Sequence, residues 1–165
     1  TRPGCAGVVT ANTRDQLVNK TWRELSKWNS RAINGHWFDW SATAFRGKEA
    51  PATWFIAAQP WTKERSEAFA GLHEKDVLVL FDEASAIDDI IWEVSEGAMT
   101  EPGALWVAFG NPTRNTGRFR ECFGKSKHRW IHRQIDSRST KRASKAFASR
   151  CWVMMKPSRG IDRPE

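Results

Sequence analysis

The sequence predicts an α/β fold with a mostly parallel sheet flanked by helices. Short stretches rich in apolar and β-branched residues alternate along the chain with stretches whose apolar residues recur at helical spacing. One stretch, residues 77–81, contains five apolar residues in succession and is typical of a strand buried on both faces of a parallel sheet. It stops at two adjacent carboxylates, Asp82 and Glu83. The remaining elements are predicted around this strand.

The first part of the chain predicts a strand followed by a helix. Residues 6–10 form a short apolar stretch, and Thr13 and Gln16 have the spacing of a capping box. Apolar positions then recur from residue 17 to residue 32, which predicts a helix of about five turns. The Asn-Gly pair at 34–35 is expected to end it.

Two strands and a short helix are expected before the central strand. Residues 36–45 and 53–59 are rich in aromatic and β-branched side chains and are separated by a polar segment. Residues 64–72 predict the short helix. After the central strand, a second capping pattern from Ser85 to Asp88 leads into a helix with one apolar face that extends to Ala98.

The last third of the chain predicts two more strands and then a less regular segment. Residues 104–109 form an apolar strand that ends in a Gly-Asn-Pro-Thr turn, and a further strand is expected at 129–135. In the basic tail, residues 139–165, an amphipathic helix is expected over Ala143, Ala146, Phe147, Cys151 and Met154. Prolines and a glycine beyond it predict a loose end.

Composition and charge limit the class of protein. The 165 residues suffice for one domain with a real core, and no apolar run is long enough to cross a bilayer. Three widely spaced cysteines indicate neither a zinc site nor a disulfide framework, so a reducing cytoplasm is expected. The chain begins at Thr1 without a signal peptide, which suggests a fragment.

Positive charge is concentrated in the last third of the chain. Residues 1–113 contain 11 Lys and Arg against 15 Asp and Glu, a net charge of −4, whereas residues 114–165 contain 15 against 4, a net charge of +11. A basic region on an acidic body suits a polyanion such as DNA. A solvated basic tail explains the charge equally well.

The paired carboxylates have the form of a Walker B motif followed by a catalytic glutamate. A strand that delivers Asp82 and Glu83 at its carboxyl end places both where open α/β sheets bind ligands. The first carboxylate can hold Mg²⁺ beside nucleotide phosphates, and the second can orient or deprotonate a water molecule. The alternative is a core strand that ends in two solvated acids.

Polar residues after the strand at 104–109 strengthen the nucleotide hypothesis. Asn111 would lie at the same sheet edge and could hydrogen-bond a γ-phosphate or the attacking water, although an isolated Asn-Pro turn is the alternative. Arg114, Arg118 and Arg120 could neutralise phosphate charge or hold DNA, or could form a solvated basic turn. His128 and His132 are four residues apart, but no Glu follows His128 and the alternation of Trp130, His132 and Gln134 fits a strand, so no metal site is expected there. No G-x-x-x-x-G-K-[ST] phosphate-binding loop occurs in the sequence.

Several stretches together resemble the large subunit of tailed-phage terminases, the ATP-driven DNA-packaging motors. They occur in family order over roughly residues 4–138, which is more specific than the Walker B motif alone. The matching stretches are residues 9–17, 20–25, 71–73, 77–86, 91–94 and 109–119.

The resemblance implies an additional-strand P-loop NTPase domain over residues 1–138, incomplete at its N-terminus, with ATP and Mg²⁺ as cofactors. Glu83 and Asn111 would be catalytic, and Asp82 would hold the metal. Asp82, Asn111, Thr113 and Arg118 would bind the cofactor. The Walker A strand is expected upstream of Thr1 and beside residues 77–81, so the isolated chain is expected to leave an edge uncovered and to be poorly soluble.

The resemblance also implies partners and a location. These are double-stranded DNA, a portal protein, a terminase small subunit and further copies in a ring, in the cytoplasm of a bacterial host and away from membranes. A helicase-like P-loop ATPase is the alternative enzyme. The non-enzymatic alternative is a prophage remnant that at most binds DNA through its basic third.

Overall fold

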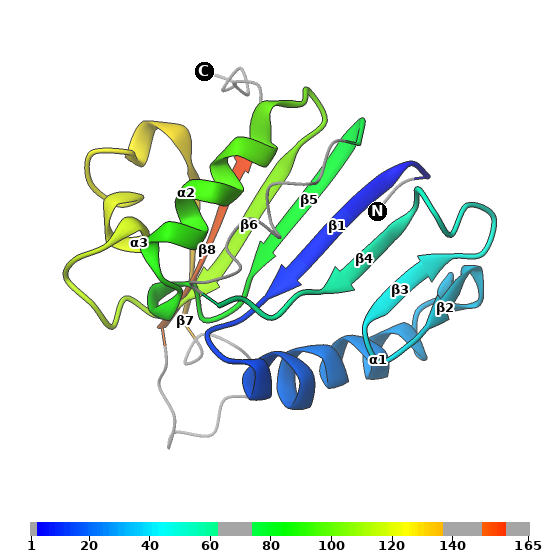
Figure 1. Cartoon of the computed structure of the whole chain (residues 1–165). Helices are drawn as coiled ribbons and strands as arrows, with labels where there is room; N and C mark the ends of the chain where they lie inside the picture. The colour runs from blue at the N-terminus through cyan, green and yellow to red at the C-terminus, as the bar shows by residue number, and fades with distance from the viewer. Residues whose placement is uncertain (1–2, 63–73, 137–149, 158–165) are drawn as a thin grey trace.

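An eight-stranded mixed sheet with helices on both faces forms the described part of the chain (Figure 1). The computed structural model describes residues 3–62, 74–136 and 150–157. The strand order is β2-β3-β4-β1-β5-β6-β8-β7. The strands are β1 (Cys5–Thr10), β2 (Phe38–Trp40), β3 (Ala44–Gly47), β4 (Phe55–Ala58), β5 (Asp76–Phe81), β6 (Leu105–Gly110), β7 (Ile131–Asp136) and β8 (Arg150–Pro157). The helices are η1 (Gln16–Trp22, a π-helix), α1 (Arg23–Asn29), α2 (Asp89–Gly97), α3 (Arg118–Glu121) and the short 3₁₀ segments η2 (Gly35–Trp37), η4 (Ala84–Ala86), η5 (Ala98–Thr100) and η6 (Lys127–Arg129).

The sheet is parallel only at its centre. Strands β4, β1, β5 and β6 run parallel to one another, whereas β2 and β3 on one side and β8 and β7 on the other join antiparallel. The α/β class is confirmed, but the expectation of a mostly parallel sheet is wrong. The prediction missed the antiparallel strands that flank the parallel centre on both sides. An antiparallel neighbour needs no crossover helix, so no helix between strands announces it in the sequence.

Strand β5 has neighbours along both of its edges. Its register runs from Cys5↔Asp76 to Thr10↔Phe81 against β1 and from Leu78↔Leu105 to Phe81↔Ala108 against β6. The expectation that a missing strand would leave residues 77–81 with an open edge is therefore wrong. The free edge of β6 is instead covered by β8.

Strand β8 comes from the tail that the sequence analysis assigned to a helix. Cys151 and Met154 belong to Arg150–Pro157, which pairs with β6 and β7. The helical expectation is wrong for these positions. Its first half, around Ala143 to Phe147, lies outside the described residues, as does the helix expected at 64–72.

The region after β1 differs from its prediction in two ways. The strand expected at 53–59 is confirmed as β4, but β2 and β3 replace the single strand expected at 36–45. The helix formed by η1 and α1 ends at Asn29, before the Asn-Gly pair. The Thr13 cap is confirmed, because its hydroxyl accepts a hydrogen bond from the Gln16 amide at 3.1 Å. In the second capping pattern the cap is Asp88, which accepts from the Ile90 amide at 3.2 Å, because Ser85 belongs to the 3₁₀ segment η4.

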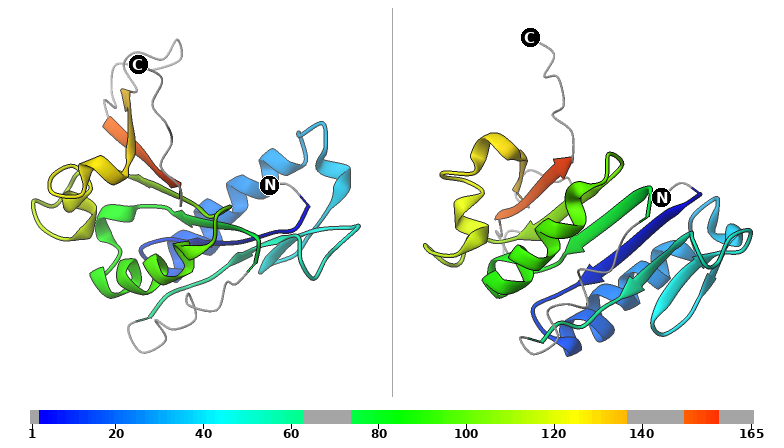
Figure 2. Two further views of the ribbon diagram at one scale, coloured as in Figure 1. Left: turned by 90° about the horizontal axis from the view of Figure 1, so that it is seen from above. Right: turned by 45° about the horizontal axis from the view of Figure 1, so that its top comes forward.

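Helices α1 and α2 cover opposite faces of the sheet (Figure 2). Alternating side chains of one strand therefore enter different cores, so that Val8 belongs to the α2 face and Val9 to the α1 face. The α2 face holds the larger cluster, with Phe81, Trp92 and Trp106 at its centre. The α1 face is thinly covered, and Leu78 and Leu80 of β5 stay half-buried there. The prediction that β5 is buried on both faces is therefore confirmed for the α2 face and only partly for the α1 face.

The described helices are all too short or too polar to span a membrane.

Candidate functional site

Three parallel strands end side by side at the carboxyl edge of the sheet. β1 ends at Thr10, β5 at Phe81 and β6 at Gly110, and the register pairs Thr10 with Phe81. The chain leaves β1 toward the α1 face and leaves β5 toward the α2 face. Such a change of direction between adjacent parallel strands is the usual place for a ligand in an open α/β sheet.

Asp82 is held in a fixed orientation at this edge. Its amide donates to the Thr10 carbonyl at 2.8 Å and so extends the β1–β5 ladder by one step. Its carboxylate accepts one hydrogen bond on each oxygen, from the Glu83 amide at 3.0 Å and from the Thr21 hydroxyl at 2.5 Å. A carboxylate has about four acceptor positions, so the two that remain can bind a further group.

Thr21 is a site residue that the sequence analysis did not identify. It lies on the π-helix η1, sixty-one positions before Asp82, and its hydroxyl also lies 3.4 Å from the Gln16 carbonyl. π-helical turns are rare and frequently mark functional sites. The available signal was a hydroxyl at an inward position of an otherwise apolar stripe, between Leu17 and Leu25.

Glu83 adopts a backbone conformation that is costly for a glutamate. Its φ of 51° and ψ of 41° lie in the left-handed region, and it is the only non-glycine residue with positive φ in the described chain. Such a conformation costs on the order of 1–3 kcal/mol and persists only where the surroundings impose it. Glu83 is exposed and directly follows Asp82 at this edge.

The loop after β6 contacts the loop after β5. The hydroxyls of Ser85 and Thr113 lie 3.1 Å apart, and a Cβ added to Gly110 would approach the Ala84 amide nitrogen to 3.2 Å. Glycine at this position therefore permits the close approach of the two loops. Asn111 is exposed beside them. The structure thus brings Asp82, Glu83, Asn111 and Thr113 to one edge, as predicted.

Thr10 brings a buried hydroxyl to the same edge. Its side chain is fully buried, and within the described residues its oxygen has no hydrogen-bond partner. An unpaired buried hydroxyl costs free energy and calls for an explanation.

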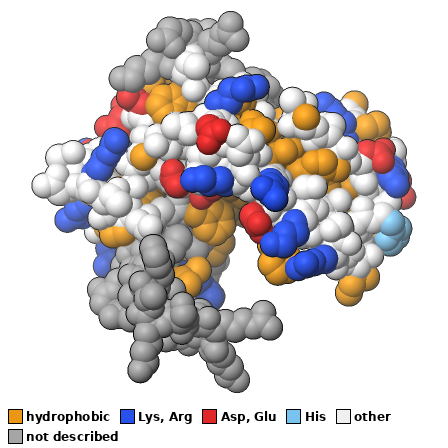
Figure 3. Space-filling view, turned by 90° about the horizontal axis from the view of Figure 1, so that it is seen from below, with side chains coloured by type: hydrophobic (Ala, Val, Ile, Leu, Met, Phe, Trp, Pro, Cys, Tyr) orange, Lys and Arg blue, Asp and Glu red, His pale blue; other side chains and the backbone are white. Residues whose placement is uncertain are grey.

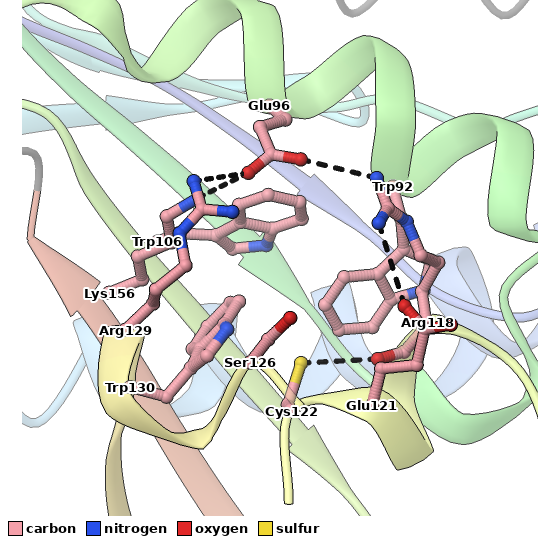
Figure 4. A pocket seen from close by; sticks show the side chains of 10 residues that line it. All are labelled: Trp92, Glu96, Trp106, Arg118, Glu121, Cys122, Ser126, Arg129, Trp130 and Lys156. Atoms are coloured by element: carbon pink, nitrogen blue, oxygen red, sulfur yellow. Dashed lines mark hydrogen bonds and ion pairs between the residues drawn. The ribbon is translucent and has the colours of Figure 1, made fainter. Parts of the chain in front are cut away.

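Arg118 does not direct its guanidinium to this edge. The group lies in a small pocket beneath α2, 3.2 Å from Glu96 and 3.6 Å from Glu121 (Figure 4). Only its amide reaches toward the strand ends, where it donates to the Asp89 carboxylate at 2.8 Å. The cofactor-binding role assigned to Arg118 from sequence is therefore not supported by where its side chain lies.

The pocket beneath α2 is a cluster of charges packed on tryptophans. Glu96 binds Arg129 at 2.6 Å and Lys156 at 2.7 Å as well as Arg118. The Lys156 ammonium lies about 6 Å from the Trp106 and Trp130 ring centroids, a cation–π arrangement. The enclosed space is only about 20 Å³, so this pocket fixes elements together and does not admit a ligand the size of a nucleotide.

Three pKa values in this pocket are shifted, and that of Glu121 is lowered chiefly by its hydrogen bond with Lys125. Burial opposes the charged form of Glu96, but the Lys156 hydrogen bond and the charges of Lys156, Arg129 and Arg118 lower its pKa below the ordinary 4.5. Burial raises the pKa of the Cys122 thiol to about 12. Cys122 is therefore a packed thiol and not a nucleophile.

Other candidates contribute no metal site in the described residues. His132 bonds the Cys122 carbonyl at 2.8 Å through a ring nitrogen, and no group of three His, Cys, Asp or Glu side chains there could hold a metal ion. Arg114 and Arg120 are exposed and line a shallow hollow after β6.

Comparison with known proteins supplies one informative match. No protein-family model matches the sequence. The probable terminase large subunit of Enterobacteria phage P7 is 28% identical over 122 residues. The match covers 71% of this chain and 25% of the relative, so the chain spans about a quarter of that relative's length. The chain is distantly related to a phage terminase large subunit.

Proposed function

We propose that this chain is part of the ATP-hydrolysing region of a terminase large subunit, the motor that drives DNA into a procapsid. The observation that carries the proposal is the placement of Asp82 and Glu83 at the point where the chain leaves adjacent parallel strands toward opposite faces. The relationship to the P7 protein supports it independently.

Asp82 fits the role of the Mg²⁺-holding residue. Mg²⁺ at a nucleotide site usually takes one or two protein carboxylates, with water and phosphate oxygens as its other ligands. The Asp82 carboxylate is oriented by Thr21 and by the Glu83 amide and keeps acceptor positions for such a ligand. The metal would supply neutralisation of charge on the phosphate oxygens.

Glu83 and Asn111 fit the roles next to the reacting phosphate. The exposed Glu83 carboxylate would orient a water molecule and accept its proton, and Asn111 would hydrogen-bond the γ-phosphate or that water. Thr113 contacts Ser85 through its hydroxyl, so a movement of the β6 loop on loss of the γ-phosphate would be passed through this contact to the β5 loop. Thr10 would offer its unpaired hydroxyl at the same edge.

The phosphate-binding loop would come from residues outside this chain. The sequence contains no such loop, and a single carboxylate holds Mg²⁺ too weakly to position a nucleotide. We therefore expect no ATP hydrolysis by the 165 residues alone. Within the full-length protein, double-stranded DNA, a portal protein, a small subunit and further copies in a ring would be the partners, in the cytoplasm of a bacterial host.

The test is Glu83→Gln in the full-length protein. ATP turnover should be abolished while ATP still binds, because the amide cannot take a proton but keeps the size of the carboxylate. Asp82→Asn should in addition weaken Mg²⁺-dependent binding. Glu93→Gln, an exposed glutamate on α2, is the matched control and should hydrolyse ATP as the wild type does.

Wild-type turnover by Glu83→Gln would refute the assignment. It would favour the alternative in which these residues bind DNA without catalysis, which the net charge of +11 over residues 114–165 supports. Unwinding of duplex DNA that is lost in Glu83→Gln would instead favour a helicase-like ATPase.

A further inference from the structure

A row of cations follows the outer side of η1 and α1. Lys20, Arg23, Lys27 and Arg31 are all exposed, and their spacing of three and four residues places them along one side of a helical rod. Arg31 continues the row two residues beyond the end of α1 at Asn29. Seen from below, several Lys and Arg side chains lie on this face of the molecule, with Asp, Glu and hydrophobic side chains among them (Figure 3).

Most of this positive charge is not neutralised by the protein. Lys27 lies 3.4 Å from Glu24, an exposed pair that contributes little. Within the described part of the chain no carboxylate pairs with Lys20, Arg23 or Arg31. The Arg31 guanidinium instead lies 5.9 Å from the Trp28 ring centroid, which favours a defined direction for this side chain.

The fold does not require these cations. α1 has no buried residue, and the rod is attached to the sheet chiefly by Leu17 and Trp22 of η1. Trp28 is 61% exposed, and Ile33 after α1 and Trp37 in η2 are 99% and 52% exposed. A helix that gives so little to the core and exposes large side chains is suited to contact another molecule.

We propose that the cationic row of Lys20, Arg23, Lys27 and Arg31 binds the phosphate backbone of double-stranded DNA. The row extends over about 16 Å, at about 1.5 Å per helical residue. A duplex carries one negative charge per about 1.7 Å of its axis and offers a continuous series of phosphates over that length. An acidic protein would have to match four separate positions with carboxylates.

The choice of DNA over another polyanion rests on the proposed function. The row is distinct from the basic third of the chain, residues 114–165. Helix contacts of this kind fix position on the duplex without reading its sequence, as a protein that moves along DNA requires.

The experiment measures binding of the whole 165-residue chain to a fluorescent duplex of mixed sequence, without nucleotide, over a series of salt concentrations. Replacing all four row residues by Gln should weaken binding roughly 10–100-fold at low salt and reduce the slope of log K against log[salt] by about 3–4. The matched control replaces Arg114, Arg120, Lys125 and Lys127 by Gln. It removes the same charge from exposed positions of the basic third and should change the affinity much less.

A charge-preserving variant guards against misfolding. Exchanging Lys for Arg and Arg for Lys at all four row positions should leave affinity and salt slope near those of the wild type, with circular dichroism showing the same helix content. Loss of binding in that variant would contradict a phosphate contact.

Three further outcomes would overturn the proposal. The first is a wild-type chain that does not bind the duplex at low salt. The second is a loss of affinity in the control variant equal to or larger than that in the row variant. The third is an affinity for the duplex that falls in Ile33→Ser and Trp37→Ser but is unchanged when the row residues are replaced. The last would indicate an apolar protein contact or a second copy. Because no nucleotide is present, failure here is separable from failure of the Glu83→Gln test.

Discussion

The two faces of the sheet differ in how many large side chains they bury. On the α2 face, Phe81, Trp92, Trp106 and Trp130 pack edge-to-face and tilted against one another, with ring centroids between 5.0 and 6.0 Å apart. On the α1 face the buried cluster is small, and α1 itself buries nothing. The comparison indicates that the α2 face supplies most of the stability, whereas the α1 face is free to serve contacts with other molecules.

The largest effect is expected from truncating the centre of the α2 face. Trp106 is 1% exposed, and Trp106→Ala should lower the free energy of unfolding by about 3–5 kcal/mol. Trp28→Ala on the α1 side is the matched control and should change it by no more than about 0.5 kcal/mol. Urea denaturation followed by circular dichroism measures both. Equal losses would show that the two faces contribute alike.

A smaller loss is expected when the charge cluster beneath α2 is broken. Glu96→Gln leaves Arg118, Arg129 and the nearly buried Lys156 without their shared carboxylate. Breaking a fully buried pair costs about 3–5 kcal/mol, and partial exposure of Glu96 reduces our expectation to about 1–3 kcal/mol. Glu93→Gln on the exposed side of the same helix should cost nothing measurable.

The effect of Glu96 should depend on pH in one direction. Because the folded-state pKa of Glu96 is lowered, its contribution is fully present above the unfolded value near 4.5 and is lost as pH falls through the folded value. The difference between wild type and Glu96→Gln should therefore be constant around neutral pH and shrink below 4.5. A difference that grows on acidification would contradict the ion pairing.

The central strands could be predicted from the sequence because their signal is local. The apolar stretch from Val77 to Phe81 and the one before Gly110 each stop at polar residues, and parallel strands align their carboxyl ends. The sequence therefore predicts Asp82, Glu83 and Asn111 at one edge of the sheet, which is where the structure has them.

The flanks and the charge cluster could not be predicted because they depend on partners distant in sequence. Arg150–Pro157 mixes apolar residues with cations and fits a strand or a helix alone, and only its pairing with β6 decides between them. The contact of Glu96 with Lys156 joins residues sixty positions apart. Thr21 and Asp82 are similarly distant, so no local pattern announces their hydrogen bond.

Thr21 of η1, on the α1 face, hydrogen-bonds Asp82 of the candidate site. Replacing Thr21 should change the free energy of unfolding by an intermediate amount. Thr21→Val keeps the shape of the side chain but removes the donor to Asp82, which should cost about 1–2 kcal/mol in unfolding free energy. Thr21→Ser keeps the hydroxyl and should retain most of that contribution. Hydrogen exchange at the Glu83 amide should also accelerate in the valine variant, because the Asp82 carboxylate that accepts it is less fixed. Valine and serine variants of equal stability would show that the contact is dispensable.

The smallest effects are expected at the two helix caps, and they compare the faces most directly. Asp88 caps α2 through the Ile90 amide, and Thr13 caps η1 through the Gln16 amide. Loss of a cap typically costs about 1 kcal/mol. Asp88→Ala should therefore lower the global free energy of unfolding by that amount, because α2 contributes Ile91, Trp92 and Ser95 to the buried core.

Thr13→Ala should instead appear mainly as local opening. η1 and α1 are attached by few buried side chains, so the helix can unfold while the sheet stays intact. Amide exchange over residues 16–29 should accelerate severalfold, with less than about 0.5 kcal/mol lost in global unfolding. Thr13→Ser should restore slow exchange, since its hydroxyl can make the same cap. If Thr13→Ala and Asp88→Ala lowered global stability equally, with exchange over 16–29 unchanged, η1 and α1 would be as firmly part of the folded core as α2. The cationic row would then lie on a structural helix and not on a loosely attached one.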